Sequence, residues 1–589
     1  MRPSLIPLVL LLCVGVRLAS GAPAILSGQV KNAASNVTVT ASGAGLAQGS
    51  YIAIYGTGLG PSTAASATVP YPTNLEGATV TITPSGGSPL PAFLTYAQAG
   101  QINAILPSSV PAGSATVTVS FGGATSPPEK INVVQSSFGV FSTGFPIGAA
   151  AVINVNTASL YNLFTNAANG GDVLELFGTG LGPITGGDNV APGIVSPAGI
   201  TVKVLVGGQS ITPVYAGRSS QYPALDQINF VLPSDGSIPD SCFVPIAVQV
   251  NGAMSNYATI AKATGSRSCV TPLGLNASAL GALDQGGTLN FGFLTLSKST
   301  IQGSLGPITA TISTEQSGAA FASLNGTGLF GLLQSPGATP PLNANGTCLV
   351  ETIDAFTPPS TTVPPVPKPL NAGASLSLSG PNSKAQTLPT IAGAGYGAFL
   401  AQSGATIGGI SLAGIVPGVP VVPAGLPSSF IEPGQWTIKG TGGSDIGAFS
   451  ASVTVPSPLV CTNCDGIGTI DRTQPLTLNW TGGGGANDYV EIAGVATAAS
   501  LASASRNVAT VFACAARASD GTFTVPASIL GQLPTSSSDP TAANTGALLI
   551  INGLGTSDGT FAAPLTAGGN LDAGYFGYAS VLTKLAGYK

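Results

Sequence analysis

Aspartate and glutamate are the residues of this chain best suited to chemistry, because its 589 residues include no histidine. Histidine is the usual general base near neutral pH, the orienting group of Ser/His/Asp and Cys/His sites and the commonest zinc ligand. All of those mechanisms are therefore excluded for this chain. Carboxylate-pair catalysis, Ser/Lys or Thr nucleophiles and calcium binding remain for consideration.

Two pairs of carboxylates lie close together in the sequence, Glu351 with Asp354 and Asp488 with Glu491. A glycosidase needs two carboxylates that face each other across a cleft. Nothing in the neighbouring sequence orients either pair, so exposed strand or loop charges are the ordinary interpretation. Calcium needs several oxygen ligands at short spacing, and residues 463–471 ("NCDGIGTID") come nearest to that pattern. We predict no catalytic residue, no metal site and no cofactor.

Three aromatic residues, Trp436, Trp480 and Tyr489, are candidates for stacking on the faces of sugar rings. Only two tryptophans occur in the whole chain, which is little support for a carbohydrate platform. A tryptophan in the core of a β-sandwich is the commoner arrangement. The sequence leaves both interpretations open, and burial of the two tryptophans would weaken the sugar-binding one.

Six cysteines follow the N-terminal segment: Cys242, Cys269, Cys348, Cys461, Cys464 and Cys514. An even number of cysteines in an exported protein indicates disulfides, although six cysteines allow 15 pairings. Cys242 and Cys269 flank one strand-rich stretch, and we expect them to pair. Cys461 and Cys464 form either a small disulfide loop or the ends of two separate bridges to the remaining two cysteines. A zinc site on this CxxC would need further ligands without histidine, which disfavours it.

The N-terminal residues 1–24 have the layout of a secretory signal peptide, with Arg2, an apolar run at 8–16 and small residues at 19–22. The apolar run is too short for a membrane span. We therefore predict a secreted or cell-surface protein with no transmembrane segment in the mature chain. The net charge of −5 and the absence of any Lys/Arg cluster disfavour nucleic acid and anionic membranes as partners.

An eight-residue phrase occurs twice, as "IYGTGLGP" at 54–61 and "LFGTGLGP" at 176–183. A second pair follows each copy, "AGQINAILP" at 99–107 and "LDQINFVLP" at 225–233, so the chain contains a tandem repeat. Short alternating segments separated by Gly and Pro turns, without an amphipathic helix, predict β-sandwiches. The glycines are expected to permit positive φ and close backbone approach. A phosphate-binding loop would require a lysine and a following helix, which the phrase lacks.

These paired motifs resemble the IPT/TIG immunoglobulin-like domains, and more closely a variant repeated in secreted proteins of soil acidobacteria. The resemblance covers residues 34–134 and 160–270. It implies a sandwich fold and export from a bacterial cell. The function of the family is largely uncharacterised, so the resemblance implies no catalytic residue.

The predicted organisation is an all-β chain of tandem immunoglobulin-like sandwiches. Beyond the repeat, strand-like alternation continues to the C-terminus, interrupted by a Pro-rich stretch that is expected to form a stiff loop. The predicted segments are a signal peptide at 1–24, sandwiches at 25–140 and 141–270, a β-rich domain at 271–456 with the Pro-rich loop at 357–370, and a C-terminal sandwich-like domain at 457–589.

The function predicted from these features is that of a secreted or surface-associated, non-enzymatic scaffold or adhesion protein. The alternative is an extracellular polysaccharide-binding protein. Recognition carried by loops on a sandwich leaves no spacing signature, so the sequence does not separate the two. The expected partner is an unidentified extracellular protein or polysaccharide.

Overall fold

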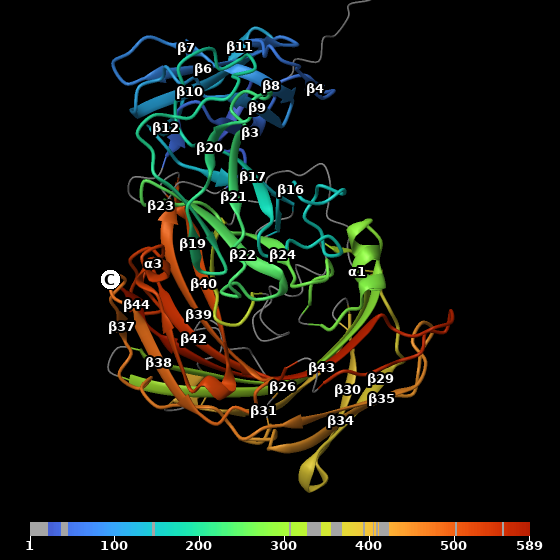
Figure 1. Ribbon diagram of the computed structural model, residues 1–589. Helices are drawn as coiled ribbons and strands as arrows, with labels where there is room; N and C mark the ends of the chain where they lie inside the picture. Colours follow the sequence, from blue (N-terminus) through green and yellow to red (C-terminus); the bar gives the residue numbers. More distant parts are fainter. Residues whose placement is uncertain are drawn as a thin grey trace, which may run out of the picture.

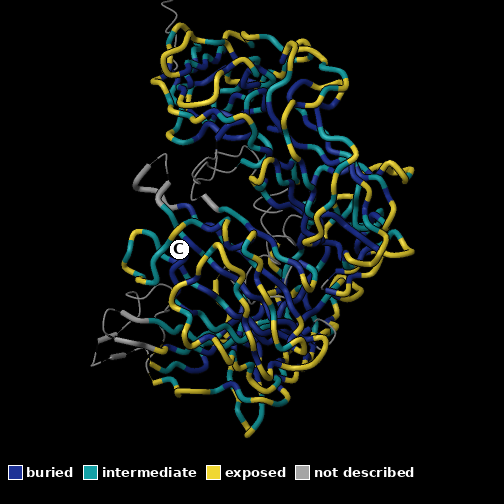
Figure 2. Tube along the Cα trace, turned by 60° about the vertical axis from the view of Figure 1, so that its left-hand side comes forward, coloured by how far each residue is buried: buried dark blue, intermediate teal, exposed yellow. Residues whose placement is uncertain are grey.

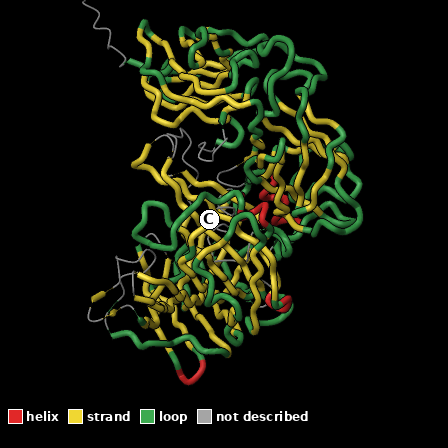
Figure 3. Tube along the Cα trace, turned by 90° about the vertical axis from the view of Figure 1, so that its left-hand side faces the viewer, coloured by secondary structure: helices red, strands yellow, loops and turns green. Residues whose placement is uncertain are grey.

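The computed structural model describes residues 22–589 apart from several internal segments. Those segments are 37–44, 144–147, 272, 306–307, 327–342, 355–367, 393–394, 405, 408–409, 412–422, 424, 501–502 and 556–558. Most of the predicted signal peptide and of the Pro-rich stretch at 357–370 lie outside the described residues. Strands and loops make up almost all of the described chain (Figure 3).

The first repeat is a two-sheet sandwich. Its strands are β1 (Ala24–Asn32), β2 (Leu46–Ala47), β3 (Tyr51–Thr57), β4 (Ala65–Ser66), β5 (Asn74–Leu75), β6 (Ala78–Pro84), β7 (Leu90–Pro91), β8 (Phe93–Gln98), β9 (Gln101–Ile105), β10 (Gly113–Phe121), β11 (Ala124–Thr125) and β12 (Glu129–Val134). One sheet has the order β1-β3-β9-β8-β4, and the other is built on β2-β12-β10-β6-β5. The alternating residues Ile52, Ile54 and Ile102 point into the core between the sheets.

The second repeat is built in the same way. Its strands are β13 (Gly139–Val140), β14 (Ser142–Thr143), β15 (Ala149–Ala150), β16 (Val152–Asn154), β17 (Val173–Thr179), β18 (Val202–Val206), β19 (Gln209–Ile211), β20 (Tyr215–Arg218), β21 (Asp226–Val231), β22 (Ser241–Val250), β23 (Ala253–Met254) and β24 (Ala258–Lys262). One sheet has the order β13-β17-β21-β20 with β16 beside β17, and the other has the order β14-β15-β24-β22-β18-β19. Leu174, Leu176 and Ile228 lie in the core.

The C-terminal part is dominated by one large curved sheet, which lies below the two repeats in Figure 1. Its strands within the described residues follow the order β27 (Cys348–Asp354), β40 (Ser503–Arg517), β39 (Tyr489–Ser500), β42 (Gly546–Gly553), β43 (Ala573–Leu585), β25 (Leu289–Leu305), β26 (Ile308–Leu324), β31 (Gly395–Ser403), β30 (Ala385–Ile391), β29 (Ser375–Ser379), β34 (Gly434–Gly440) and β35 (Phe449–Val455), with β28 (Lys368–Pro369) beside β26. Short elements complete this part: α1 (Ala277–Asp284), β32 (Thr406–Ile407), β33 (Ile410–Ser411), β36 (Val460–Cys461), β37 (Thr469–Ile470), β38 (Leu476–Thr481), β41 (Thr522–Val525), α3 (Ala527–Leu530), β44 (Gly587–Tyr588) and two 3-10 turns at Pro381–Ser383 and Ala518–Asp520.

The boundary predicted at residue 456 does not separate two sheets. Strands β39, β40, β42 and β43 come from the predicted C-terminal domain, yet they lie in the same sheet as β25 and β26 from the predicted third domain. Two pairings link the predicted domains: β25 lies parallel to β43, and β27 lies antiparallel to β40. Regions 271–456 and 457–589 therefore form one body rather than the two that the sequence analysis predicted.

The predicted fold class, an all-β chain with tandem immunoglobulin-like sandwiches, is confirmed by these sheets. Buried segments run inside each sandwich and along the large sheet (Figure 2). The second repeat also packs against the C-terminal part, because Phe243 of β22 shares a core with Leu280 of α1 and Phe291 of β25.

The glycines of the repeated phrase allow the N-terminal segment of each sandwich to pack closely against the phrase. That segment is β1 in the first repeat and residues 137–140 in the second. In the second copy, a Cβ on Gly178 would overlap the Phe138 ring, and a Cβ on Gly180 would overlap the Ser137 carbonyl oxygen. Gly180 also has a φ of +108°, which disfavours any other residue. In the first copy, a Cβ on Gly56 would overlap the Ala24 carbonyl oxygen. Close approach and positive φ therefore explain the phrase, as the sequence analysis predicted.

Candidate functional site

A buried ion pair lies at the junction between the two repeats. Arg218, at the end of β20, is the register partner of Asp226, at the start of β21, and the Arg218 guanidinium and the Asp226 carboxylate form the pair. Both side chains are completely buried. Arg218 Nη2 also donates to the carbonyl oxygens of Gly49 in the first repeat and Gly182 in the second, each at 2.8 Å. One guanidinium group therefore binds both repeats.

The backbone of the second phrase completes the surroundings of Asp226. The Leu181 N–H donates to Asp226 Oδ2 at 2.8 Å. Burial raises the pKa of the Asp226 carboxyl, and the Arg218 guanidinium and the Leu181 amide counteract this effect. Asp226 occupies the position of Gly100 in the first repeat, whose turn between β8 and β9 carries no charge. A sandwich of this kind thus forms without the ion pair, which indicates that the pair serves the junction.

Further hydrogen bonds cross the same junction. Asn32 Nδ2 donates to the Thr179 carbonyl oxygen at 3.2 Å, and the Tyr51 N–H donates to Thr179 Oγ1 at 2.9 Å. The backbone N–H and the hydroxyl of Ser108 both donate to the Asp188 carboxylate, each at 2.7 Å. Residues on the first repeat therefore bind the second phrase and the loop after it at several separate points.

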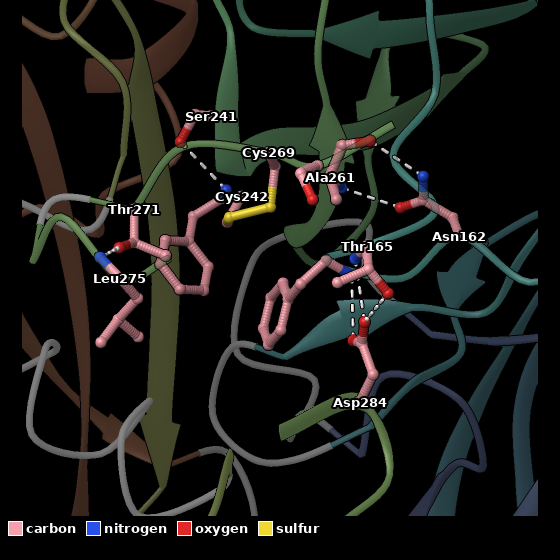
Figure 4. Close-up of a disulfide and its surroundings, with 12 residues drawn as sticks. Asn162, Thr165, Ser241, Cys242, Ala261, Cys269, Thr271, Leu275 and Asp284 are labelled. Atoms are coloured by element: carbon pink, nitrogen blue, oxygen red, sulfur yellow. Dashed lines mark hydrogen bonds between the residues drawn. A yellow bond between two sulfur atoms is a disulfide. The ribbon is translucent and has the colours of Figure 1, made fainter. Parts of the chain in front are cut away.

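A second polar junction joins the second repeat to α1 (Figure 4). Asp284, the last residue of α1, accepts hydrogen bonds from the Phe164 N–H at 2.9 Å and from the N–H and hydroxyl of Thr165 at 2.8 and 2.7 Å. The disulfide between Cys242 and Cys269 lies beside this contact. The helix is thereby tied to the loop that follows β16.

The other two disulfides lie in the C-terminal part. Cys348 on β27 bonds to Cys514, its register partner on β40, and so ties the edge strand of the large sheet to its neighbour. Cys461 bonds to Cys464 and closes a small loop after β36. Of the two arrangements that the sequence left open for "CTNC", the structure therefore has the local loop.

The three aromatic residues considered for sugar stacking are all buried, so none of them forms an exposed platform. Trp436 lies on β34 of the curved sheet and is 0% exposed, because its ring is part of a hydrophobic core of the C-terminal part. Its Nε1 donates to the Glu432 carbonyl oxygen at 2.9 Å. Trp480 and Tyr489 are 4% and 5% exposed. The indole of Trp480 donates to the Ala518 carbonyl oxygen at 2.8 Å. Their rings stabilise the core, which is the common role of aromatic side chains in sandwiches.

Three of the four carboxylates that the sequence analysis interpreted as exposed strand or loop charges are instead buried or half-buried: Asp488 is 5% exposed, and Glu351 and Glu491 are described next. The side chain of the fourth, Asp354, lies outside the described residues. Glu351 of β27 is half-buried, and Glu491 of β39 is buried. Burial raises the pKa of each carboxyl to about 7. The two strands are separated by β40, and in register Glu351 lies opposite Val511 whereas Glu491 lies opposite Ala515. This offset along different strands does not form the facing pair that a glycosidase needs.

Sequence reasoning did not identify Arg218 and Asp226 as a site. The one available signal was the comparison of the two repeats, in which a charged residue replaces Gly100 of the first copy. Among the described residues, no group of three or more His, Cys, Asp or Glu side chains is placed to hold a metal ion. Within the same residues, no helix is both long and apolar enough to cross a membrane.

Comparisons with known proteins give no family for the chain. No protein-family model matches it, and no curated protein matches it. A tetra-tandem repeat from the extending region of a large adhesion protein is 11% identical, covers 92% of this chain and 97% of its own, and has a TM-score of 0.12. SGBP-B from a xyloglucan utilization locus of Bacteroides uniformis is 11% identical, covers 62% and 80%, and has a TM-score of 0.14. Domains 4–9 of the surface layer protein SbsC are 12% identical, cover 94% and 83%, and have a TM-score of 0.15. TM-scores this low support no inference about function.

Proposed function

We propose that this chain is an extracellular, non-enzymatic scaffold or adhesion protein. Its two N-terminal modules, immunoglobulin-like and of the IPT/TIG kind, act as one rigid spacer that projects from the C-terminal sheet. The observation that carries the proposal is the buried Arg218, which binds Asp226 in its own module and the Gly49 carbonyl oxygen in the preceding one.

A rigid junction is unusual for neighbouring domains, whose interfaces commonly permit relative motion. A buried ion pair is costly to desolvate. The two hydrogen bonds from Arg218 Nη2 to backbone carbonyl oxygens offset part of that cost, although Arg218 Nε has no hydrogen-bond partner among the described residues. Rotation of the first module would withdraw the Gly49 carbonyl oxygen from Arg218 and leave one N–H of its Nη2 without an acceptor in a buried site. The buried Arg218 guanidinium therefore opposes rotation of the first module against the second more strongly than an apolar contact of the same area would.

Extracellular placement is supported by the signal-like N-terminus and by three disulfides, which persist in oxidising compartments. A non-enzymatic role is supported by the lack of histidine and by the separation of Glu351 from Glu491 in the large sheet. The polysaccharide-binding alternative loses the basis it had in Trp436, Trp480 and Tyr489, because their rings are buried.

The test is small-angle X-ray scattering of the mature, disulfide-intact chain, combined with localisation of the protein in its source cells. We expect that a single rigid arrangement of the two modules and the C-terminal sheet fits the scattering profile of the wild type. Arg218→Ala should require an ensemble of module orientations. A wild-type profile that already requires such an ensemble, or a protein confined to the cytoplasm, would contradict the proposed function.

A further inference from the structure

The sheet of the second repeat that contains β17, β21 and β20 has an open outer face. Leu174, Leu176 and Ile228 point into the core, so the alternate residues of the same strands point outward. We call this surface the outer face. It is formed by Ile153, Val155, Tyr161, Val173, Glu175, Phe177, Tyr215, Gln227, Asn229 and Val231. Val155, Val231 and Tyr161 are 44%, 42% and 65% exposed, which is unusual for large apolar and aromatic side chains gathered on one surface.

The register of the strands places these residues next to one another. Val173 of β17 lies opposite Val231, and Glu175 lies opposite Asn229. Asn229 in turn lies opposite Tyr215 of β20. On its other side, Glu175 lies opposite Ile153 of β16, and Ile153 forms a bridge with Tyr161. The outer face is therefore one continuous surface.

A chain of side-chain hydrogen bonds runs through the centre of the outer face. Gln227 Nε2 donates to Asn229 Oδ1 at 3.0 Å, and Asn229 Nδ2 donates to Glu175 Oε1 at 3.2 Å. The first repeat has the same first step, from Gln101 Nε2 to Asn103 Oδ1 at 2.8 Å. At the position of Glu175, however, the first repeat has Ala53, which is buried. Only the second repeat thus combines a carboxylate with an open face.

The loop that carries Tyr161 maintains an unfavourable conformation. Leu160 has a φ of +60°, in the left-handed region that glycine and asparagine occupy at lower cost, and its side chain is 47% exposed. The loop is nevertheless ordered by hydrogen bonds: Asn166 Nδ2 donates to the Tyr161 carbonyl oxygen at 2.6 Å. Backbone strain held in place by surrounding bonds is characteristic of functional loops.

We propose that the outer face binds a neutral polysaccharide, with the Tyr161 ring against a sugar face and with Glu175, Asn229 and Gln227 hydrogen-bonded to sugar hydroxyls. The amides and the carboxylate keep donor and acceptor positions beyond those used between themselves, and hydroxyl groups match both kinds. Glu175 repels an anionic glycan, and none of the residues that form the outer face is cationic. This proposal does not depend on the rigid junction.

The arrangement of polar and apolar groups favours a glycan over a protein partner. Protein–protein interfaces have an apolar centre and a polar rim. The outer face has the reverse arrangement, because Glu175, Asn229 and Gln227 form its polar centre and apolar residues such as Val155, Tyr161 and Val231 lie around them. A sugar chain suits this arrangement, because its hydroxyl groups bind the polar centre while its C–H faces pack on the rim.

The experiment is affinity gel electrophoresis of the full mature chain in native gels that contain hydroxyethyl cellulose, xyloglucan, galactomannan or dextran, with alginate as an anionic polysaccharide. We expect at least one neutral polysaccharide to retard the wild-type chain. Tyr161→Ala and Asn229→Ala should each weaken that association about fivefold to tenfold, through loss of ring contact and of a hydrogen bond. Thermal unfolding of each variant establishes that the chain remains folded.

Tyr222→Ala is the matched control, because Tyr222 is also an exposed tyrosine of the second repeat, at 51%, but lies in the loop between β20 and β21. Its retardation should equal that of the wild type. Retardation by alginate alone, or equal retardation of the wild type, Tyr161→Ala and Asn229→Ala, would overturn the proposal. So would the absence of retardation by every neutral polysaccharide, even where the chain binds whole cells through Tyr161, since that result would assign the face to a protein partner. Loss of the rigid junction in scattering experiments would leave this result unaffected.

Discussion

Arg218 and Asp226 face each other across the register pair at the ends of β20 and β21, and Arg218 also reaches the Gly49 carbonyl oxygen of the preceding module. The ion pair is therefore part of both the second sandwich and the contact between sandwiches. Stability of the second module and orientation of the first are consequently expected to respond to the same substitution. The first repeat, with Gly100 in place of the aspartate, provides a natural reference for a sandwich without the pair.

Arg218→Ala should lower the free energy of unfolding of the second module by about 3–5 kcal/mol, because it leaves the Asp226 carboxylate buried without a cation. The double variant Arg218→Ala/Asp226→Gly should lose less, since it removes the orphaned charge and restores the residue type of the first repeat. Hydrogen exchange of the β20 and β21 amides measures both losses. A double variant that is less stable than Arg218→Ala would contradict the assigned role of the pair.

Gly180→Ala should also destabilise the junction, because its Cβ would overlap the Ser137 carbonyl oxygen in addition to the strain of a φ of +108°. Gly171→Ala is the matched control, since Gly171 has a φ of +90° but open space around the Cβ position. Hydrogen exchange of the β13 and β17 amides should show a larger loss of protection for Gly180→Ala. Equal losses of protection would show that φ strain alone determines the cost in stability, and that the close approach of the Ser137 carbonyl oxygen to Gly180 does not contribute.

The disulfide between Cys348 and Cys514 should contribute more to stability than the one between Cys461 and Cys464. Their sequence separations are 166 and 3, and chain-entropy arguments give about 5 and about 2 kcal/mol for loops of these lengths. Paired Cys→Ala variants, followed through the melting temperature under non-reducing conditions, test the order. If removal of Cys461 and Cys464 costs as much as removal of the other pair, native-state packing rather than loop closure determines their contribution.

Trp436→Ala should cost about 3–5 kcal/mol of stability in the C-terminal sheet, as expected for the loss of a fully buried ring. Trp436→Phe should cost less, because it keeps an aromatic ring in the core. Neither substitution should change retardation by a neutral polysaccharide at temperatures where the chain is folded. Loss of retardation without loss of melting temperature would restore the interpretation of Trp436 as a sugar platform.

The repeat, the all-β class and the role of the Gly-rich phrase could be predicted because each depends on residues close together in the sequence. Alternation places Ile52 and Ile54 in the core of the first sandwich wherever their partner strands come from. The joining of the two C-terminal regions could not be predicted, because alternation in β25 does not specify β43 as its neighbour. Burial of Glu491 was missed for a related reason: its strand lies in the middle of the large sheet, between β40 and β42, and only the tertiary structure shows what covers it.

Glu491 should make the C-terminal part less stable as the pH rises. Its carboxyl has a pKa of about 7 in the folded chain because burial favours the neutral form, whereas the ordinary value is 4.5. Between these two values the folded state binds a proton that the unfolded state has released. The free energy of unfolding contributed by this group therefore falls as the pH rises from about 4.5 to about 7, by up to about 3 kcal/mol.

Glu491→Gln removes the titrating proton while keeping the shape of the side chain, so this variant should be more stable than the wild type at pH 8 and similar to it at pH 4.5. Glu351→Gln should act in the same direction and by a similar amount, because burial raises the pKa of the Glu351 carboxyl to about 7 as well. Glu76→Gln, a substitution of an exposed carboxylate in the first repeat, is the control. Denaturant unfolding of the variants across this pH range measures the difference from the wild type. A constant difference between Glu491→Gln and the wild type from pH 4.5 to 8 would show that Glu491 stays ionised in the folded sheet, with a counter-charge that compensates its burial.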